Sequence, residues 1–77
     1  MKLVLEFTNK EIREEYSAKL EANGFKISLN RYGTMFVEIN HLNFCRGGYV
    51  EIIDEECNQT SIKLSDVEDF EVQKEIN

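Results

Sequence analysis

The sequence has 77 residues, a formal net charge of −6 and 42% hydrophobic residues. This composition is typical of a globular chain and the length suffices for one small core, so we expect a single α+β domain over residues 1–77. No apolar stretch is long enough for a signal peptide or a membrane span, and Cys45 and Cys57 do not form a secreted disulfide framework, which predicts a cytoplasmic protein without membrane contact.

A strand and a helix are predicted at the start of the chain. Residues 2–7 alternate so that one side is strongly apolar, which is typical of a strand. A helix is expected to begin at Thr8, because Thr8 and Glu11 have the spacing of a capping box, and to end at Gly24, which favours a left-handed terminator. The inward stripe of this helix consists of Ile12, Tyr16 and Leu20.

Further strands are predicted wherever apolar and polar side chains alternate. They lie around residues 25–29, 35–39, 49–53 and 60–64. The segment 41–46 fits either a continuation of the preceding strand or a loop. Together these elements give the order β-α-β-β-β-β, with one N-terminal helix packed on a curved antiparallel sheet of about five strands.

The last segment, residues 66–76, fits two structures. A helix is compatible with the spacing of Val67, Phe70 and Lys74. A strand, which we favour, would follow a short turn at 65–68 as a sixth strand. In that case one side would present Asp69, Glu71, Gln73 and Glu75.

Catalytic and metal-binding residues are sparse. The one histidine, His41, has no motif partner, and the spacing of His41, Cys45 and Cys57 lacks the paired knuckle typical of zinc sites. We therefore expect no enzyme, no cofactor and no metal. A nucleic-acid surface would have to use Lys26, Arg31 and Arg46 with Tyr32, Phe44 and Tyr49. Because an acidic domain repels a polyanion, no direct nucleic-acid binding is expected.

The net negative charge of the chain comes from its last third. Residues 1–53 carry equal numbers of acidic and basic residues, so the entire excess lies in residues 54–77. Carboxylates two apart on a strand are separated by roughly 6.6 Å, close to the rise of about 6.8 Å for two phosphate steps of one DNA strand. The same acids also fit an ordinary solvated face. The candidate partner-binding residues are Asp54, Glu55, Glu56, Asp66, Glu68, Asp69, Glu71 and Glu75.

In size, charge and lack of a catalytic motif, the chain resembles the small acidic proteins that bacteriophages make to disable host factors. Some of those proteins occupy the DNA site of a histone-like nucleoid protein, a nuclease or an RNA polymerase. The resemblance implies a non-catalytic binding or inhibitor protein that engages a basic, DNA-binding protein by imitating nucleic acid. The alternative is a structural or adaptor domain that forms a homodimer, or joins a larger assembly, through an apolar sheet face. That alternative is suggested by Phe36, Val37, Val50, Ile52 and Ile53, which place apolar side chains on both faces of strands.

Overall fold

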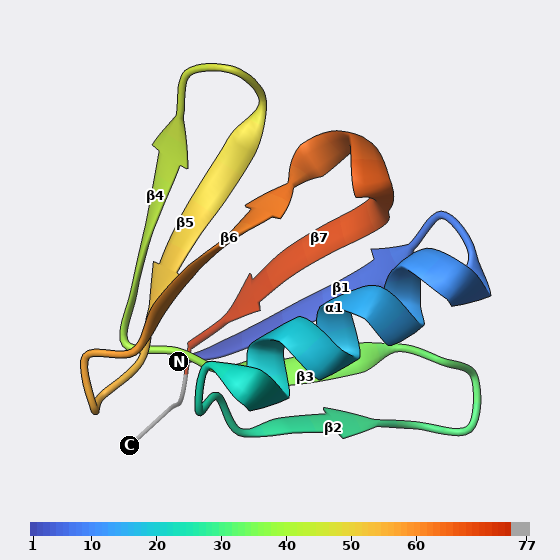
Figure 1. Cartoon of the computed structure of the whole chain (residues 1–77), viewed down its shortest axis with the longest axis horizontal. Helices are drawn as coiled ribbons and strands as arrows, with labels where there is room; N and C mark the ends of the chain where they lie inside the picture. Colours follow the sequence, from blue (N-terminus) through green and yellow to red (C-terminus); the bar gives the residue numbers. More distant parts are fainter. Residues whose placement is uncertain (75–77) are drawn as a thin grey trace.

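The structure of the chain is a computed structural model, which describes residues 1–74 (Figure 1). The elements are β1 (Lys2–Phe7), α1 (Lys10–Ala22), β2 (Ile27–Leu29), β3 (Met35–Glu38), β4 (His41–Cys45), β5 (Tyr49–Ile53), β6 (Gln59–Lys63), a 3-10 turn (Leu64–Asp66) and β7 (Val67–Gln73). The predicted α+β class is confirmed, and the order of elements is close to the predicted one, with β4 as an additional strand. The strands form two antiparallel sheets, ordered β2-β3-β1-β7 and β4-β5-β6, in place of one curved sheet of about five strands.

Helix α1 begins one residue later than the sequence indicated. Its N-cap is Asn9, whose Oδ1 accepts a hydrogen bond from the N–H of Ile12 at 2.9 Å. Thr8 does not cap the helix, because its backbone continues the pairing of β1 and donates its N–H to the carbonyl of Asp66. The predicted terminator is confirmed: Gly24 has a φ of +87°, a left-handed conformation that glycine adopts without steric cost.

The chain passes from one sheet to the other between β3 and β4. The N–H of Ile39 donates to the carbonyl of Met1, next to β1, whereas the N–H of Asn40 donates to the carbonyl of Ile53, at the end of β5. Consecutive amides therefore bond to different sheets. The segment that follows, which the sequence left open between strand and loop, is a separate strand, β4.

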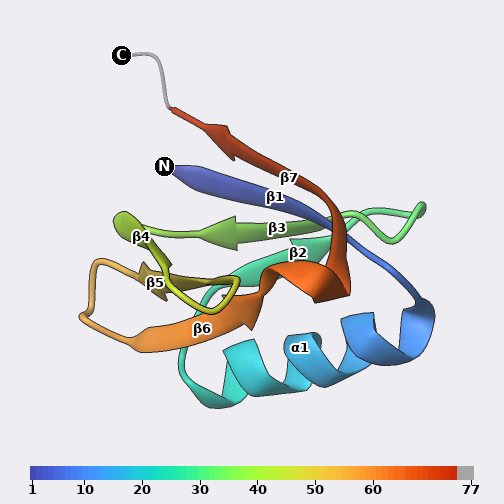
Figure 2. The same ribbon diagram turned by 90° about the horizontal axis from the view of Figure 1, so that it is seen from above.

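The core lies on one side of the four-stranded sheet. Figure 2 shows α1 and the three-stranded sheet on this side, and no other element of residues 1–74 covers the opposite face. Helix and second sheet together exclude water from the inward side chains of β1 and β3. The buried hydrophobic residues are Leu3, Leu5, Phe7, Leu20, Phe25, Met35, Val37, Ile39, Val50, Ile52 and Ile62.

Side chains of α1 close the outer edge of β6. The Tyr16 hydroxyl accepts a hydrogen bond from the N–H of Lys63 at 3.1 Å, and Lys19 Nζ donates to the carbonyl of Ser61 at 2.9 Å. An edge strand normally presents such groups to solvent. The helix therefore both packs on the core and satisfies one edge of the three-stranded sheet.

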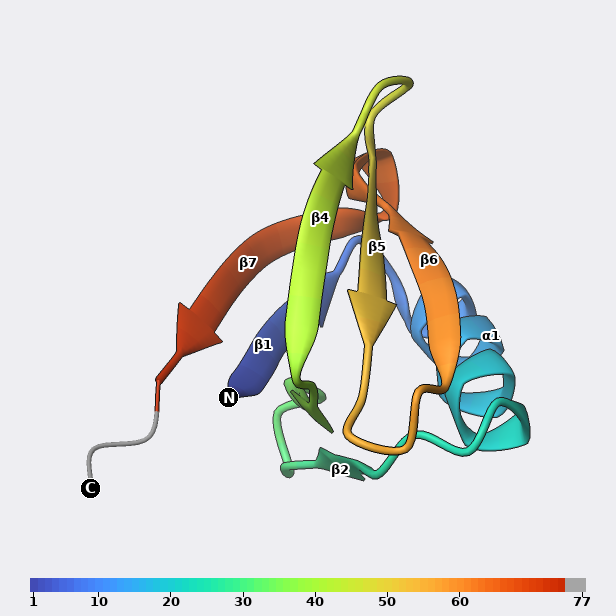
Figure 3. The same cartoon turned by 90° about the vertical axis from the view of Figure 1, so that its left-hand side faces the viewer.

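The final described element, β7, is a strand, so the structure favoured for this segment is confirmed within Val67–Gln73. It pairs antiparallel with β1, and Phe70 and Val72 lie opposite buried residues of that strand. The register shifts near its start and leaves Glu68 without a partner on β1. Such a bulge increases local twist, and Figure 3 shows β7 curving away from β4 toward its C-terminal end.

Candidate functional site

The uncovered face of the four-stranded sheet gathers acidic side chains from three strands. Leu3 and Leu5 of β1 are fully buried, so the residues that alternate with them point away from the core. Neighbours directly opposite on adjacent strands share a face, which adds side chains of β3 and β7. We call this surface the outer face, and its charged and apolar residues are Lys2, Val4, Glu6, Lys26, Phe36, Glu38, Asp69 and Glu71.

Negative charge dominates the outer face. Glu6 and Asp69 are direct cross-strand neighbours, a position at which like charges repel. The described chain places two bases among them: Lys2, whose Nζ lies 3.6 Å from a carboxylate oxygen of Glu38, and Lys26, whose backbone carbonyl accepts a hydrogen bond from the N–H of Glu38 on the neighbouring strand. Both side chains of the Lys2–Glu38 ion pair are well exposed, so it contributes only about 0–1 kcal/mol. The remaining carboxylates leave the face with a negative potential.

The row of carboxylates expected along β7 is short. Asp69 and Glu71 are exposed and two residues apart, so they have the separation of about 6.6 Å that strand geometry gives. The next outward position is Gln73, which is neutral. Glu75 lies outside the described residues. Within residues 1–74, acids from β1 and β3 therefore extend the charged surface sideways across the sheet.

Asp54 is buried and holds a turn together. Its side chain accepts hydrogen bonds from the N–H groups of Glu56 at 3.0 Å and Asn58 at 2.8 Å, and from Asn58 Nδ2 at 2.9 Å. Desolvation raises the pKa of Asp54, but the hydrogen bonds from Asn58 and Glu56, helped by the charge of Lys26, outweigh it and hold the pKa below its ordinary value. Asp54 as a whole residue is only 8% exposed, so its carboxylate adds little to any binding surface.

Asp66 is half-buried and bound to the helix. The Tyr16 hydroxyl donates to its Oδ2 at 2.7 Å. Burial raises the pKa of Tyr16, and the Asp66 carboxylate raises it further, while the hydrogen bond from the N–H of Lys63 works in the opposite direction. Asp66 therefore anchors the 3-10 turn to α1 rather than facing a partner freely.

Glu55 and Glu56 are exposed at the turn after β5 and lie beside the outer face. They border a hollow of about 380 Å³ together with Glu38, which belongs to the outer face. This shared hollow connects the turn to the acids of the sheet. Its complete lining is Lys26, Glu38, Ile39, Asp54, Glu55 and Glu56.

Glu68 is exposed at the bulge, at the other end of β7. It borders a second hollow that also contains Glu6, together with Lys10 and Arg13 from α1. The two bases offset part of the local negative charge. Glu68 is therefore a marginal member of the acidic surface.

The sequence prediction missed Glu6 and Glu38. Both lie in the part of the chain where acids and bases balance, so the charge count gave no reason to select them. Their positions on β1 and β3 bring them beside β7, which is distant in sequence. Strand alternation marks each residue as outward-facing, but only the strand order β2-β3-β1-β7 places them on one surface.

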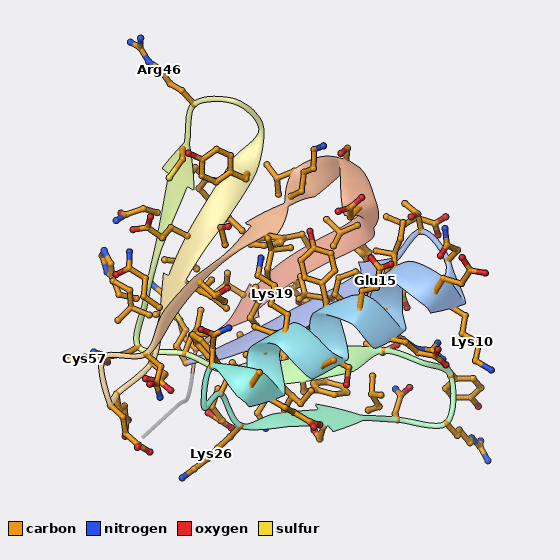
Figure 4. The ribbon with its side chains drawn as sticks, in the orientation of Figure 1. Lys10, Glu15, Lys19, Lys26, Arg46 and Cys57 are labelled. Carbon is orange, nitrogen blue, oxygen red and sulfur yellow. The ribbon has the colours of Figure 1, made fainter. Side chains whose placement is uncertain are left out.

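The other candidate residues do not come together. His41 and Cys45 share a face of β4, where residues four apart are separated by roughly 13 Å. Figure 4 shows Cys57 on the loop before β6, and Lys26 and Arg46 at opposite ends of the molecule. Residues 1–74 contain no group of three or more His, Cys, Asp or Glu placed to hold a metal ion. In the same range, no helix has the length and apolarity to cross a membrane.

Comparisons of the chain with protein-family models, with curated proteins and with solved structures gave no match.

Proposed function

We propose that this domain is a non-catalytic, acidic binding protein of the cytoplasm, whose outer face engages a basic surface of another protein. The observation that carries the proposal is the convergence of Glu6, Glu38, Asp69 and Glu71 from three strands on one uncovered sheet face. A surface with an excess of one charge sign steers oppositely charged partners and selects against like-charged ones. Glu55 and Glu56 extend the same potential around the hollow that they share with Glu38.

We further propose that the partner's basic surface is a DNA-binding site, which the domain occupies in competition with DNA. Two features support this. Asp69 and Glu71 have a spacing of about 6.6 Å along β7, close to two phosphate steps of one DNA strand. Glu6 lies opposite Asp69, so the carboxylates form a patch wide enough to meet more than one basic side chain. A histone-like nucleoid protein is a suitable test partner because a DNA-binding site neutralises phosphates with lysine and arginine side chains.

The test is displacement of DNA from such a protein. A short fluorescent duplex is bound to the purified nucleoid protein, and the domain is titrated in while anisotropy is recorded. Competition predicts release of the duplex at low salt and less release at high salt. Formation of a ternary complex, or no effect on the duplex at any salt concentration, would contradict the inhibitory role.

Two charge-matched variants locate the surface. The face variant carries E6Q, E38Q, D69N and E71Q, and the helix variant carries E11Q, E14Q, E15Q and E21Q. Each removes four negative charges, and the four helix acids are exposed on α1, across the sheet from the outer face. Competition should be lost in the face variant and retained in the helix variant.

A structural or adaptor role is the second candidate. Its supporting observations are the half-buried Phe36 on the outer face and Phe44 of β4, which is 65% exposed. The second sheet accounts for much of the apolar pattern that suggested this role, since it helps to bury Val37, Val50 and Ile52. Sedimentation equilibrium over a wide concentration range tests it, because a homodimer predicts a mass that rises toward twice that of the monomer.

A further inference from the structure

We infer that the free edge of β7 accepts an extended peptide strand with alternating basic and apolar residues, which extends the four-stranded sheet. This inference rests on the proposed function, because it states how a basic partner would engage the outer face. In strand addition, the unpaired backbone of an edge strand supplies hydrogen bonds, and alternate side-chain contacts supply specificity.

The two sheets have four edges, and β7 is the most suitable of them. The edge of β6 is occupied by Tyr16 and Lys19 of α1. Strand β2 has only 3 residues, and β4 has 5 residues without an acidic side chain. Strand β7 has 7 residues, pairs with β1 on one side, and has no strand on its other side in the described chain.

The backbone of β7 shows which residues face the free edge. The N–H of Phe70 donates to Oδ1 of Asp69 at 3.0 Å, so it is not directed at β1. Backbone groups of a strand alternate in direction, and the N–H and C=O of Phe70 and Val72 therefore both face outward from the edge. Asp69 and Glu71 direct their backbone groups toward β1 instead.

The side chains of β7 specify the pattern of the incoming strand. Residues opposite Phe70 and Val72 would lie on the inward side, where both are half-buried. There Phe44 of β4 stands next to Phe70, with ring centroids 5.7 Å apart, and remains largely exposed. Apolar side chains fit this side. Residues opposite Asp69 and Glu71 would lie on the outer face, where lysine or arginine finds opposite charges.

Asp69 links two contacts of the incoming strand: the hydrogen bond to the N–H of Phe70 and the pairing of a basic side chain with a carboxylate. In the free domain its carboxylate accepts a hydrogen bond from the N–H of Phe70. A carbonyl of the incoming strand would take that N–H and release the carboxylate to pair with a basic side chain of the same strand. In the free domain the hydrogen bond from Phe70 to Asp69 thus satisfies this edge N–H, and an incoming peptide strand can replace it.

The experiment uses two synthetic peptides of identical composition and the full chain. In one, lysine and valine alternate; in the other, they stand in separate blocks. Fluorescence anisotropy at low salt should show the alternating peptide binding about tenfold more tightly, equivalent to about 1.4 kcal/mol. Amide hydrogen exchange should slow at Phe70 and Val72 on binding. An alternating peptide with N-methylated backbone positions should lose the preference.

Four results would overturn strand addition. Equal binding of the alternating, block and N-methylated peptides would mean that charge alone acts, and would leave the proposed function intact. Failure of every peptide, alongside DNA displacement by the domain, would likewise remove only the strand mechanism. Protection of Phe70 and Val72 by self-association, without peptide, would assign the edge to a second copy of the chain. Failure of both the peptides and the displacement assay would remove the proposed function as well.

A variant of the chain adds a separate check. V72P removes one edge N–H and leaves every acidic residue in place, and proline is tolerated at positions whose N–H faces solvent. It should bind both lysine–valine peptides equally. Val72→Ala is the control, because it keeps the N–H and should keep the preference. If V72P fails to fold, the N-methylated peptide tests the same backbone contact.

Discussion

Glu6 of β1 and Asp69 of β7 lie directly opposite each other on the outer face, and both side chains are exposed. Like charges at such a position destabilise a sheet, and we take the magnitude to be comparable to that of a favourable cross-strand pair, about 0.2–1 kcal/mol. Thr34 offers Glu6 only a long hydrogen bond of 3.3 Å. The pair therefore costs the free domain stability, and a basic partner placed between the two carboxylates would remove that cost.

Neutralising either member of this pair should stabilise the free domain while it weakens binding. For E6Q or D69N we expect a gain of about 0.2–1 kcal/mol in the free energy of unfolding, measured by urea denaturation. The double variant should gain less than the sum of the single changes, because the repulsion can be removed only once. E15Q on α1 is the control. A loss of stability in both single variants would show that the two carboxylates do not repel.

The Tyr16 hydroxyl joins three elements, and its removal should destabilise the fold. Y16F leaves the Asp66 carboxylate without its 2.7 Å donor and the N–H of Lys63 without its acceptor. We expect a loss of about 1–3 kcal/mol, mainly because the Asp66 carboxylate is left without its donor at a part-buried site. Y49F is the matched control, because Tyr49 lies on the exposed side of β5. Equal unfolding midpoints for the two variants would contradict this role.

The turn held by Asp54 should give the stability a pH dependence. Because the folded pKa of Asp54 lies below its ordinary value of 3.8, the carboxylate contributes stability at neutral pH, and this contribution is lost as the pH falls through the folded pKa. D54N should therefore be less stable than wild type at pH 7, with a difference that shrinks below about pH 4. E55Q, at an exposed position of the same turn, should show no such trend. Urea denaturation as a function of pH measures both.

Two leucines test where the core lies. Leu20 is fully buried between α1 and the sheets, whereas Leu29 of β2 is 47% exposed. L20A should lower the free energy of unfolding by about 2–5 kcal/mol, because it removes buried methyl groups and leaves a cavity. L29A should have a much smaller effect. Similar losses for both variants would mean that β2 is packed in solution against something that covers Leu29.

Local patterns predicted most of the elements. The helix followed from the spacing of Ile12, Tyr16 and Leu20, and its end from Gly24. The N-cap was misassigned because Thr8 and Asn9 both suit that position, and the choice depends on a hydrogen bond between Thr8 and the distant Asp66. The choice between Thr8 and Asn9 as N-cap is therefore made by a tertiary contact and not by the local sequence.

The division into two sheets could not be predicted from alternation. It depends on the amides of Ile39 and Asn40, which bond to different sheets. The composition of the candidate surface likewise depends on contacts that alternation does not reveal. Asp54 and Asp66 counted as free acids in the sequence, yet each is held by hydrogen bonds to its neighbours in the fold. Glu38 had no signal in the charge count and joins the surface only through the strand order.

The most direct measurement of the central claim is the salt dependence of binding, compared between the two charge-matched variants. Dissociation constants for the nucleoid protein are measured across a range of salt concentrations for wild type, the face variant and the helix variant. If the outer face supplies the interaction, wild type and helix variant will share a steep salt dependence, and the face variant will bind weakly with a shallow one. Equal weakening in both variants would show that only net charge matters, which would contradict a binding role for the outer face.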